Sequence, residues 1–525
     1  MRALGIGSVR LVGRAALIVA CLSAGASWRA SAEACVTANV GATGPEPAWV
    51  VLGESELPQH PLSLDLGRCA RLTLFGSARM RVERVPELHY AAPPVSQPQV
   101  VGEPRPASLV PEPLTRVGAS FDSGRRFGDF VVSALYEHEL VSGLRGHTVP
   151  PEQGGYPREV RSADVSAEPR RAYGRFALGS VVGLQLGFDT SHFGLGLVEN
   201  DGAHDPAPGA ASFADPRGGD RVLEARLFTG PVGDVGFSSY VALQSTRGQL
   251  GEEARLLGGA RLGVDDIDWL GVQLSAQGVS VDEVGEDYDP RSGHRHHRLG
   301  VAGSYAFDFG AELLSIEAEV AREWGTRSPA GRALSAHGAA ARATLSAGRL
   351  TVGLTTLFAS GDSEPTRGER TAFMADANFD QGLLLFRRVQ AVQSAGRTTS
   401  QGVAGIREGG TGGGASNAFT LFPRVGYRLT TGLDAYAGVL FAFAVTAPVA
   451  PDAPRRGPFG AEPGGYWGTE YDVGARLRVL AWGSLLTLGA EAGVLDPGSA
   501  LEGSPAVPGA GEVAALARGF ANFDW

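Results

Sequence analysis

The sequence contains no lysine, and all 46 of its basic residues are arginine. That absence excludes a Schiff-base lysine, a lysine general base and the lysine of a phosphate-binding P-loop. No G-x-S-x-G or H-E-x-x-H motif occurs either, which removes the signatures of serine hydrolases and zinc proteases. We therefore predict a protein that is not an enzyme and needs no cofactor or metal. The formal net charge of -10 argues against nucleic acid as a partner.

Long apolar runs are also missing. Beyond the first 32 residues there is no run of 18 apolar residues, so the sequence predicts no membrane-spanning helix. The other architecture that crosses a membrane, the closed β-barrel, stays open. Residues 1–32 read as an export signal peptide, because a basic start and a short apolar core precede a small-x-small cleavage site after Ala32. A lipoprotein signal ending at Cys21 is the alternative.

Cysteine is scarce, with three residues in 525. One lies in the signal peptide, and the other two, Cys35 and Cys69, fit one disulfide in an oxidising compartment. Two unpaired buried thiols are the alternative. Because "CARLTLF" and "RMRVERV" read as two short strands, residues 33–90 are predicted to form a small periplasmic α+β module. The Pro-rich residues 91–126 are predicted to be an extended linker.

From residue 127 to the end, apolar and polar residues alternate in segments of strand length. In "LLSIEAEVARE", Leu314, Ile316 and Val320 face one way, while Glu317 and Glu319 face the other. Strict alternation of this kind is a strand signature. The polar face carries Arg and Glu beside Gly and Ala, which is typical of a wet, crowded barrel lumen.

The connections between these segments are alternately short and long, as in outer-membrane barrels with short periplasmic turns and long external loops. We count sixteen strands, with 14–18 as the range, one of them over 183–198. Pro423 lacks a ladder donor, so the strand around it needs a bulge or a different boundary. The predicted fold is all-β: residues 127–525 form a transmembrane antiparallel β-barrel of about 16 strands, following the small N-terminal module.

The last residue is a large aromatic, Trp525, with Phe523 two positions before it. This ending is the C-terminal signal that outer-membrane barrels share, and it predicts that both rings lie at the periplasmic aromatic girdle. We therefore expect the protein in the outer membrane of a Gram-negative bacterium, with both termini in the periplasm.

Two segments resemble a known family. "GFDTSHFGLGLVENDG" followed by "GDRV", and "FMADANFDQGLLLFRRVQAV" later in the chain, are similar to elements of a family of myxobacterial and related deltaproteobacterial outer-membrane barrels. The matching residues of the first element are His192, Gly194, Gly196, Asn200, Asp201, Asp220 and Arg221. The resemblance implies a porin-like barrel of alginate-export-type outline, whose activity is uncharacterised.

A barrel of this size leaves an aqueous channel, so the leading hypothesis is passive diffusion of small hydrophilic solutes. Selectivity would come from charged residues on the polar face of the strands. The candidate pore-lining residues are Glu224, Arg226, Arg255, Arg261, Glu317, Glu319, Arg342, Arg424, Arg428, Arg476, Arg478 and Glu491.

The connection 361–416 is long enough to be a functional segment. Its "FDQGLLLFRRVQAV" predicts a short helix with one apolar face, which either folds into the lumen as a constriction or caps the external loops. The cluster His294, His296 and His297 lies beside acidic residues, and a divalent-metal site there is a weaker alternative to a charged loop.

Other functions stay open. The barrel could export polysaccharide or another solute, or serve in assembly with its N-terminal module docking a periplasmic partner. An enzyme would need to use a pair such as Ser191 and His192. The expected partners are outer-membrane lipid, lipopolysaccharide and the barrel assembly machinery. Neither the solute nor the oligomeric state follows from the sequence, and a trimer is one of the states left open.

Overall fold

The computed structural model describes 18 stretches of the chain. They are residues 62–67, 70–85, 108–124, 130–149, 158–178, 182–200, 221–232, 235–245, 254–267, 272–284, 295–310, 312–327, 332–362, 369–390, 413–446, 465–481, 484–501 and 513–525. In parts of these stretches, including all of β8 and β9, only the backbone is described. Within the described residues no helix is long and apolar enough to cross a membrane.

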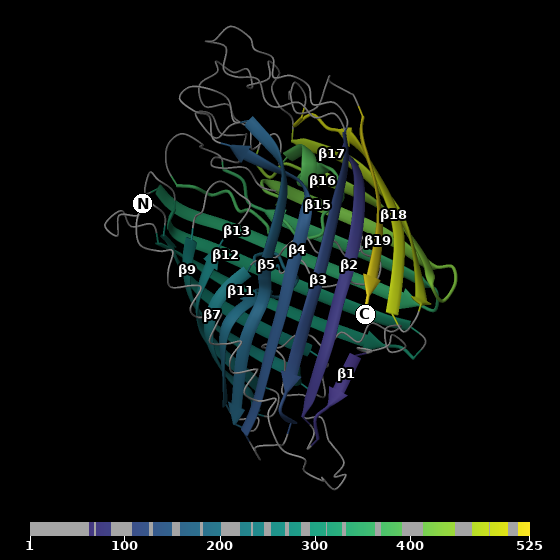
Figure 1. The fold of residues 1–525 in the computed structure, drawn as a ribbon. Coiled ribbons are helices and arrows are strands. Elements are labelled where there is room, and N and C mark those ends of the chain that lie inside the picture. Colours follow the sequence, from purple (N-terminus) through teal and green to yellow (C-terminus); the bar gives the residue numbers. More distant parts are fainter. Residues whose placement is uncertain are drawn as a thin grey trace.

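Nearly all the described residues lie in one antiparallel sheet (Figure 1). Its long strands are β2 (Arg71–Val85), β3 (Ser108–Asp122), β4 (Phe130–Val149), β5 (Arg158–Leu178), β6 (Val182–Thr190), β7 (Arg221–Val232), β8 (Val235–Ser245), β9 (Ala254–Ile267), β10 (Val272–Val284), β11 (Arg295–Asp308), β12 (Glu312–Arg327), β13 (Arg332–Ala347), β14 (Leu350–Ala359), β15 (Ala418–Arg428), β16 (Leu433–Phe443), β17 (Tyr466–Ala481), β18 (Ser484–Pro497) and β19 (Ala514–Asp524). A short strand, β1 (Leu62–Asp65), precedes them, and a helical turn, η2 (Leu385–Gln390), follows β14.

The sheet closes on itself. Each strand from β2 to β19 pairs with the next in the chain, and β19 pairs with β2 in the register Phe523↔Ala78. Strand β2 extends beyond the end of β19, and β1 pairs with that extension, Leu64 opposite Leu72. The described residues therefore form a closed barrel of eighteen strands, β2 to β19, with no free edge along its wall.

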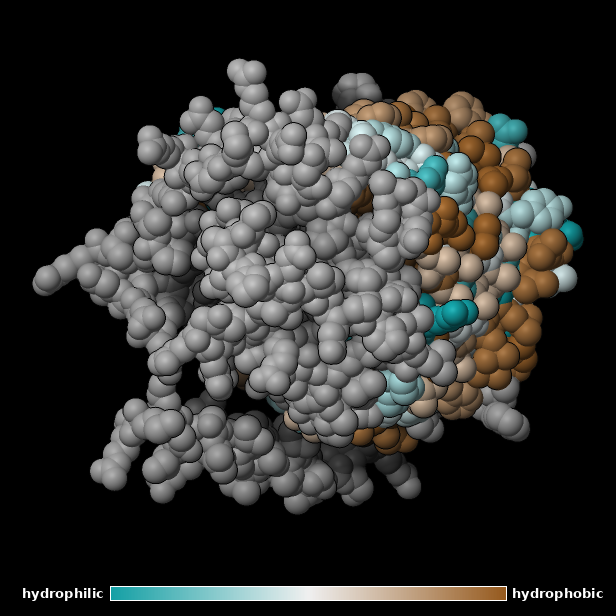
Figure 2. Space-filling model, turned by 90° about the horizontal axis from the view of Figure 1, so that it is seen from above, coloured by the Kyte–Doolittle hydropathy of each residue, from teal (hydrophilic) through white to brown (hydrophobic). Residues whose placement is uncertain are grey.

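The two faces of the wall differ as the alternation predicts. On β14 the exposed residues Val352 and Leu354 alternate with Thr355 and Leu357, which are completely buried. In Figure 2 the coloured part of the surface, on the right of the view, is largely brown, with paler and hydrophilic residues between the apolar ones. A closed antiparallel barrel with an apolar outside and polar groups inside satisfies every backbone group without water, as a membrane requires.

The strand count corrects the predicted domain boundaries. Strand β2 lies inside the predicted module 33–90, and β3 lies inside the predicted linker 91–126. They pair with each other along their whole length, and β2 closes the barrel. The alternation from Arg79 to Glu83 already had a barrel pattern, but the prolines in β3 concealed the second strand. Eighteen strands keep the even number and fall at the top of the expected range.

The two cysteines of the predicted disulfide, Cys35 and Cys69, lie outside the described residues, so the disulfide stays a prediction.

Two predictions about single strands have different outcomes. The strand predicted over 183–198 is wrong after Thr190, where β6 ends and the chain turns into the barrel. The strand around Pro423 is present and keeps its register: it pairs with β14 throughout, and its ladder to β16 lacks only the pairs at residues 422 and 423. Pro423 thus removes a donor without producing a bulge.

The C-terminal aromatics lie on the outer face of the wall. Phe523 and Trp525 alternate with the buried Arg518, so they occupy the outer face of β19. Their ring centroids are 5.9 Å apart. The backbone of Trp525 exchanges two hydrogen bonds with Gly76 of β2, of 2.9 and 3.0 Å. Trp525 therefore extends the pairing between β19 and β2, where the barrel closes, and contributes an aromatic ring to the outer surface.

Candidate functional site

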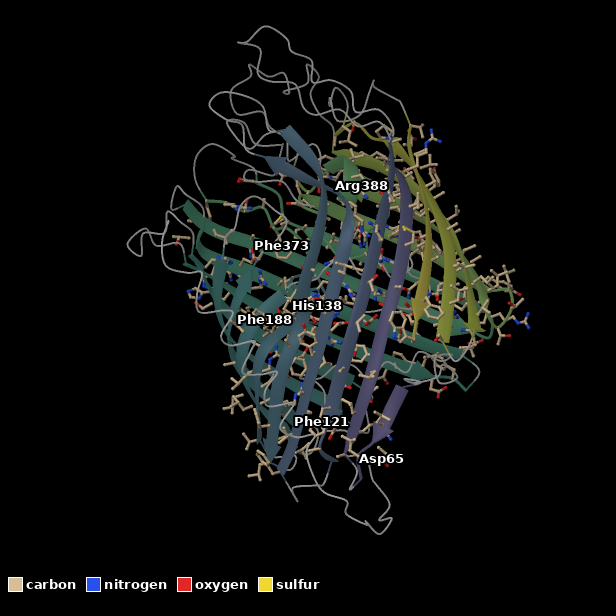
Figure 3. All side chains as sticks on the ribbon, in the orientation of Figure 1. Asp65, Phe121, His138, Phe188, Phe373 and Arg388 are labelled. Atoms are coloured by element: carbon tan, nitrogen blue, oxygen red, sulfur yellow. The ribbon has the colours of Figure 1, made fainter. Side chains whose placement is uncertain are left out.

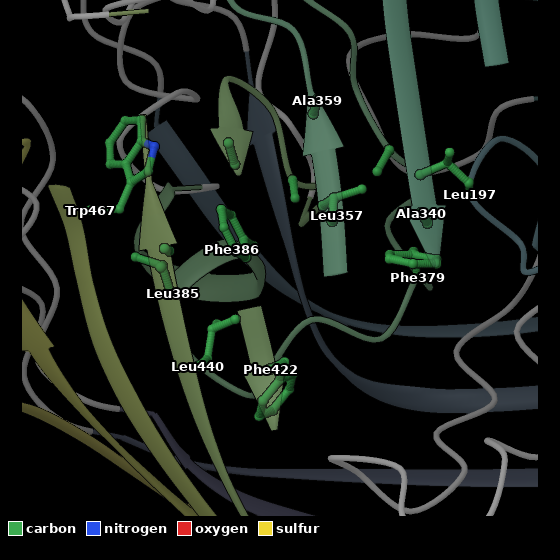
Figure 4. Close-up of a cluster of buried hydrophobic side chains, with 14 of the residues drawn as sticks. Leu197, Ala340, Leu357, Ala359, Phe379, Leu385, Phe386, Phe422, Leu440 and Trp467 are labelled. Carbon is green, nitrogen blue, oxygen red and sulfur yellow. The ribbon is translucent and has the colours of Figure 1, made fainter. Parts of the chain in front are cut away.

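The long connection after β14 enters the barrel. Its described part, residues 369–390, contributes Phe373, Phe379, Leu385 and Phe386 to a cluster of buried apolar side chains (Figure 4). The wall contributes small and apolar residues to the same cluster, among them Ala340 of β13. Gly338 provides further space, because a Cβ atom there would collide with the ring of Phe373. The inward alternative of the sequence prediction is therefore confirmed.

One carboxylate of the wall holds the start of the helical turn. Glu470 of β17, which is completely buried, accepts hydrogen bonds from three consecutive backbone N–H groups. The donors are Leu383 and Leu384, at 2.5 and 2.7 Å from Oε1, and Leu385, at 2.7 Å from Oε2. These N–H groups belong to the first turn of a helical segment and have no partner within it. Glu470 supplies that partner together with a charge of favourable sign.

Two further polar contacts fix the segment on either side of this anchor. Asp380 accepts a hydrogen bond of 2.8 Å from Nη1 of Arg424 on β15. At the other end of the segment, Arg388 of η2 forms an ion pair with Glu83 of β2. Figure 3 labels Phe373 and Arg388 among the side chains of the barrel. The segment is thus tied by charged contacts to both β15 and β2.

Another segment, residues 191–200, also folds inward, directly after β6. In chain order, residues 191–200 are here called the first inner segment and residues 369–390 the second. The first inner segment carries the motif on which the proposed resemblance to a barrel family rests. Gly194 and Gly196 have φ angles of +55° and +77°, a left-handed conformation that other residues adopt at a cost. These two turns bring Leu197 back onto the wall, where its N–H donates to Oε2 of Glu319 on β12 at 3.1 Å. The glycines of the motif therefore shape an inward loop and do not continue a strand.

The two inner segments, 191–200 and 369–390, contact each other. The N–H of Asp376 donates to the carbonyl oxygen of Leu197 at 2.8 Å, and Nδ2 of Asn378 donates to the carbonyl oxygen of Asn200 at 3.3 Å. Phe379 packs in the same buried cluster as Leu197. The family motif and the long connection, which are far apart in the sequence, therefore form one body inside the barrel.

Glu199 anchors the first segment to the wall. It accepts hydrogen bonds from Ser191 Oγ at 2.5 Å and from Gln277 Nε2 of β10 at 2.9 Å. Arg298 of β11 lies 3.6 Å from the same carboxylate. The ring of His192 instead contacts the carbonyl oxygen of Gly194 at 3.1 Å. The Ser191 hydroxyl is thus engaged by a structural carboxylate.

The wall from β3 to β7 carries paired charges on its inner face. Arg116 lies 2.6 Å from Glu139, and Arg170 lies 3.0 Å from Glu137. Further round the barrel, Gln185 of β6 receives hydrogen bonds from Arg175, and the Arg226–Glu224 pair follows on β7. This ladder of opposite charges gives the inner wall a polar lining of both signs, which a water-filled passage requires.

At the end with tight turns, three arginines surround one carboxylate. Asp434 of β16 lies 2.8 Å from Arg478, 3.4 Å from Arg476 and 3.7 Å from Arg428. All three arginines were candidate pore-lining residues. Their side chains are 17 to 41 % exposed, so they are partly accessible at this end of the barrel. The local excess of positive charge lies at this mouth.

The other candidates whose side chains are described lie on the same inner face. Glu317 and Arg342 face each other across β12 and β13 at 3.6 Å. Glu491 of β18 accepts hydrogen bonds from Tyr436 at 2.6 Å and from Arg518 at 2.5 Å. The side chains of Arg255, Arg261 and Arg221, and the residues Asp201 and Asp220, lie outside the described part. Whether the charged candidates line a conducting path stays a prediction.

The histidine cluster is divided between two faces. His296 is buried on the inner side of β11, and its neighbour His297 is on the outer side. Adjacent residues of a strand point in opposite directions, so these two imidazoles do not converge on one ion. Within the described residues no group of three His, Cys, Asp or Glu side chains is arranged to hold a metal. His294 lies outside the described part.

Sequence reasoning missed Glu83, Asp380, Glu470 and Arg388. Glu83 was assigned to a different domain. Glu470 is on the polar face of its strand, but its partners are 85 to 87 residues away and belong to a loop. No local pattern identifies such a contact.

These features define a class: a closed antiparallel β-barrel with an apolar outside, charged residues inside and two segments folded into its interior. No protein-family model matches the chain, and no curated protein matches it either.

Several crystal structures of Pseudomonas aeruginosa proteins are similar in fold. OccK5 (OpdH) has 11% sequence identity and a TM-score of 0.48, over 86% of this chain and 97% of that one. OccK1 (OpdK) has 10% identity and a TM-score of 0.48, over 86% and 98%. OccK2 (OpdF), in complex with glucuronate, has 12% identity and a TM-score of 0.47, over 86% and 97%.

Proposed function

We propose that this chain is an outer-membrane channel through which small hydrophilic solutes diffuse passively. The observation that carries the proposal is the body formed by the two inner segments, tied by Glu470, Arg424 and Glu83 to the inside of a closed barrel. An eighteen-strand barrel is wide enough for an aqueous channel. Segments that fold inward narrow such a channel and limit the size of what passes.

The position of the inner segments supports a path along one side of the barrel. Their contacts run over β10 to β17 and reach β2, through Gln277, Glu319, Arg424, Glu470 and Glu83. The charged ladder of β3 to β7 lies on the remaining part of the wall. We infer that solutes pass between the inner segments and this ladder, because its charged side chains supply the polar groups that a path for hydrophilic solutes needs.

The orientation is part of the proposal. Outer-membrane barrels place their short turns and both termini in the periplasm. The tight connection between Asp308 and Glu312 lies at the same end of the barrel as Trp525, and both inner segments enter from the opposite, long-loop end. The export signal that the sequence predicts over residues 1–32 would agree with this placement. Membership of the myxobacterial and deltaproteobacterial barrel family is likewise proposed, on the motif that forms the first inner segment.

Solute flux into liposomes tests the function. The mature protein, refolded and confirmed as a heat-modifiable barrel, is placed in liposomes, and their swelling is followed in sugars of increasing size. We expect monosaccharides to enter and larger oligosaccharides to be excluded. Liposomes with boiled protein serve as the control. Swelling that is equally absent for every sugar would contradict the proposal and favour an export or assembly barrel.

A further inference from the structure

The outer face of the barrel carries an arginine where lipid is expected. On β12 the side chains of Ile316, Val320, Arg322 and Trp324 are exposed, while Glu319, Ala321 and Glu323 between them are buried. Arg322 therefore belongs to the outer face, with an apolar neighbour two positions before it and an aromatic one two positions after it. Its guanidinium carbon lies 5.9 Å from the centre of the Trp324 ring.

The level of Arg322 follows from the length of the strand. Glu312, at the tight turn, and Arg322 are the charged residues that bound the apolar outer row of Leu314, Ile316, Ala318 and Val320. The ten residue-to-residue steps from 312 to 322 span about 33 Å along a strand. At the tilt usual for such barrels this corresponds to roughly 23–27 Å across the membrane, the height of the apolar band. Arg322 therefore lies at the upper boundary of that band, where headgroups begin.

Neighbouring strands place hydrogen-bonding side chains at the same level. His297 of β11 is paired with Trp324, and their ring centroids are 5.7 Å apart. His337 of β13 is paired with Arg322 and is exposed. Both histidines alternate with inward residues, so they are on the outer face with the arginine. Three adjacent strands thus contribute Arg322, Trp324, His297 and His337 to one patch, here called the outer basic patch.

The positive charge of Arg322 has no acidic ion-pair partner among the described residues of the wall. Among the described residues, the contact of Arg322 is the Trp324 ring, and no carboxylate lies within 4.0 Å of its guanidinium. Glu323, the adjacent acid, points into the barrel and pairs with Arg298 at 3.0 Å. A cation at a membrane boundary is stabilised by an anionic headgroup, and a guanidinium binds phosphate with two parallel hydrogen bonds.

We propose that the outer basic patch docks a phosphate-bearing lipid headgroup of the outer leaflet. Arg322 binds the phosphate, with its position fixed by the ring of Trp324. The N–H groups of His297 and His337 donate to the remaining phosphate oxygens. The apolar row below Arg322 lies against the acyl chains of the same lipid. The proposal concerns the outside of the wall and does not depend on whether the lumen conducts.

Lipid retention tests the patch. The refolded full-length mature protein is mixed in detergent with equal amounts of lipid A and phosphatidylcholine, and the bound lipid is counted by native mass spectrometry. We expect lipid A to be retained in preference to phosphatidylcholine, and R322Q to lower its retention several-fold. R322K should keep part of it. Inorganic phosphate in millimolar excess should displace little, because it lacks the acyl chains.

Arg84 provides the matched control. It is an exposed arginine on the outer side of β2, opposite Ala517 and Leu109, and no ring contact holds it among the described residues. R84Q removes the same charge from another part of the outer face and should leave lipid A retention unchanged. Each variant is first confirmed as a heat-modifiable barrel. Equal loss in R84Q and R322Q, or equal retention of lipid A and phosphatidylcholine by the wild type, would overturn the proposal. Loss of binding in R322Q with unchanged solute flux would support it independently of the channel function.

Discussion

Glu470 holds the start of the helical turn in the second inner segment. Its carboxylate accepts three backbone N–H groups in a completely buried site. In E470Q one of the oxygens becomes an amide nitrogen that cannot accept, so at least one buried N–H loses its partner. Such a loss costs about 1–3 kcal/mol. We expect E470Q to release the segment and to give larger, noisier single-channel currents than the wild type.

E317Q is the control for this change. Glu317 also faces the lumen, but its contact is Arg342 of the wall at 3.6 Å and not an inner segment. The two variants remove the same charge from neighbouring regions. If E317Q and E470Q alter the current noise equally, the effect comes from lumen charge and the role assigned to Glu470 is wrong.

For single residues, the sequence could predict which side of the barrel wall a side chain lies on. It could not predict which residue that side chain would bind. Alternation correctly placed Glu319 and Arg424 on the inner side of their strands. It could not show that Glu319 binds the N–H of Leu197, because that contact joins residues 122 apart. Glu491 illustrates the same limit, since its partners Tyr436 and Arg518 come from two other strands.

The inner segments are the elements that distinguish this barrel from an empty one. Arg388 of the second segment pairs with Glu83 of β2, which joins the end of η2 to the wall near the seam. R388E would place two carboxylates together in a site that is 2 % exposed at Glu83. We expect R388E to displace the segment and raise conductance, because like charges at this distance repel strongly. Planar-bilayer recording measures the change.

The exchanged pair E83R/R388E restores opposite charges. Its conductance should return toward the wild-type value while R388E alone stays high. Equal conductance in the single and double variants would show that the ion pair does not hold the segment.

Element boundaries could be predicted where the alternation is uninterrupted. The alternating segment "LLSIEAEVARE", residues 313–323, lies wholly within β12. The strand over 183–198 failed because "SHFGLGLVEN" continues the apolar and glycine pattern of a strand, while the positive φ angles of Gly194 and Gly196 turn it inward. Strand β3 was missed for the opposite reason: it is a strand, but Pro111 and Pro113 made its sequence look like a linker.

At the scale of the whole molecule, the barrel begins earlier than the composition suggested. Strand β2 closes the ring against β19, so residues 71–85 are part of the wall. Deleting residues 33–61 leaves every described strand in place, whereas deleting 33–90 removes β1 and β2 and opens the barrel. We expect the first variant to fold and the second to fail, as judged by heat-modifiable mobility on a gel. Folding of both variants would contradict the assigned closure.

The central claim is that two inner segments narrow an otherwise wide barrel. Single-channel conductance tests it most directly, with the refolded wild type compared with a variant in which a short Gly-Ser linker replaces residues 363–416 between β14 and β15. That replacement preserves both strands, whose ladder is continuous from Leu350↔Tyr427 to Ala359↔Ala418. We expect small, steady conductance steps for the wild type and steps several-fold larger for the variant. Identical steps from two properly folded barrels would contradict it.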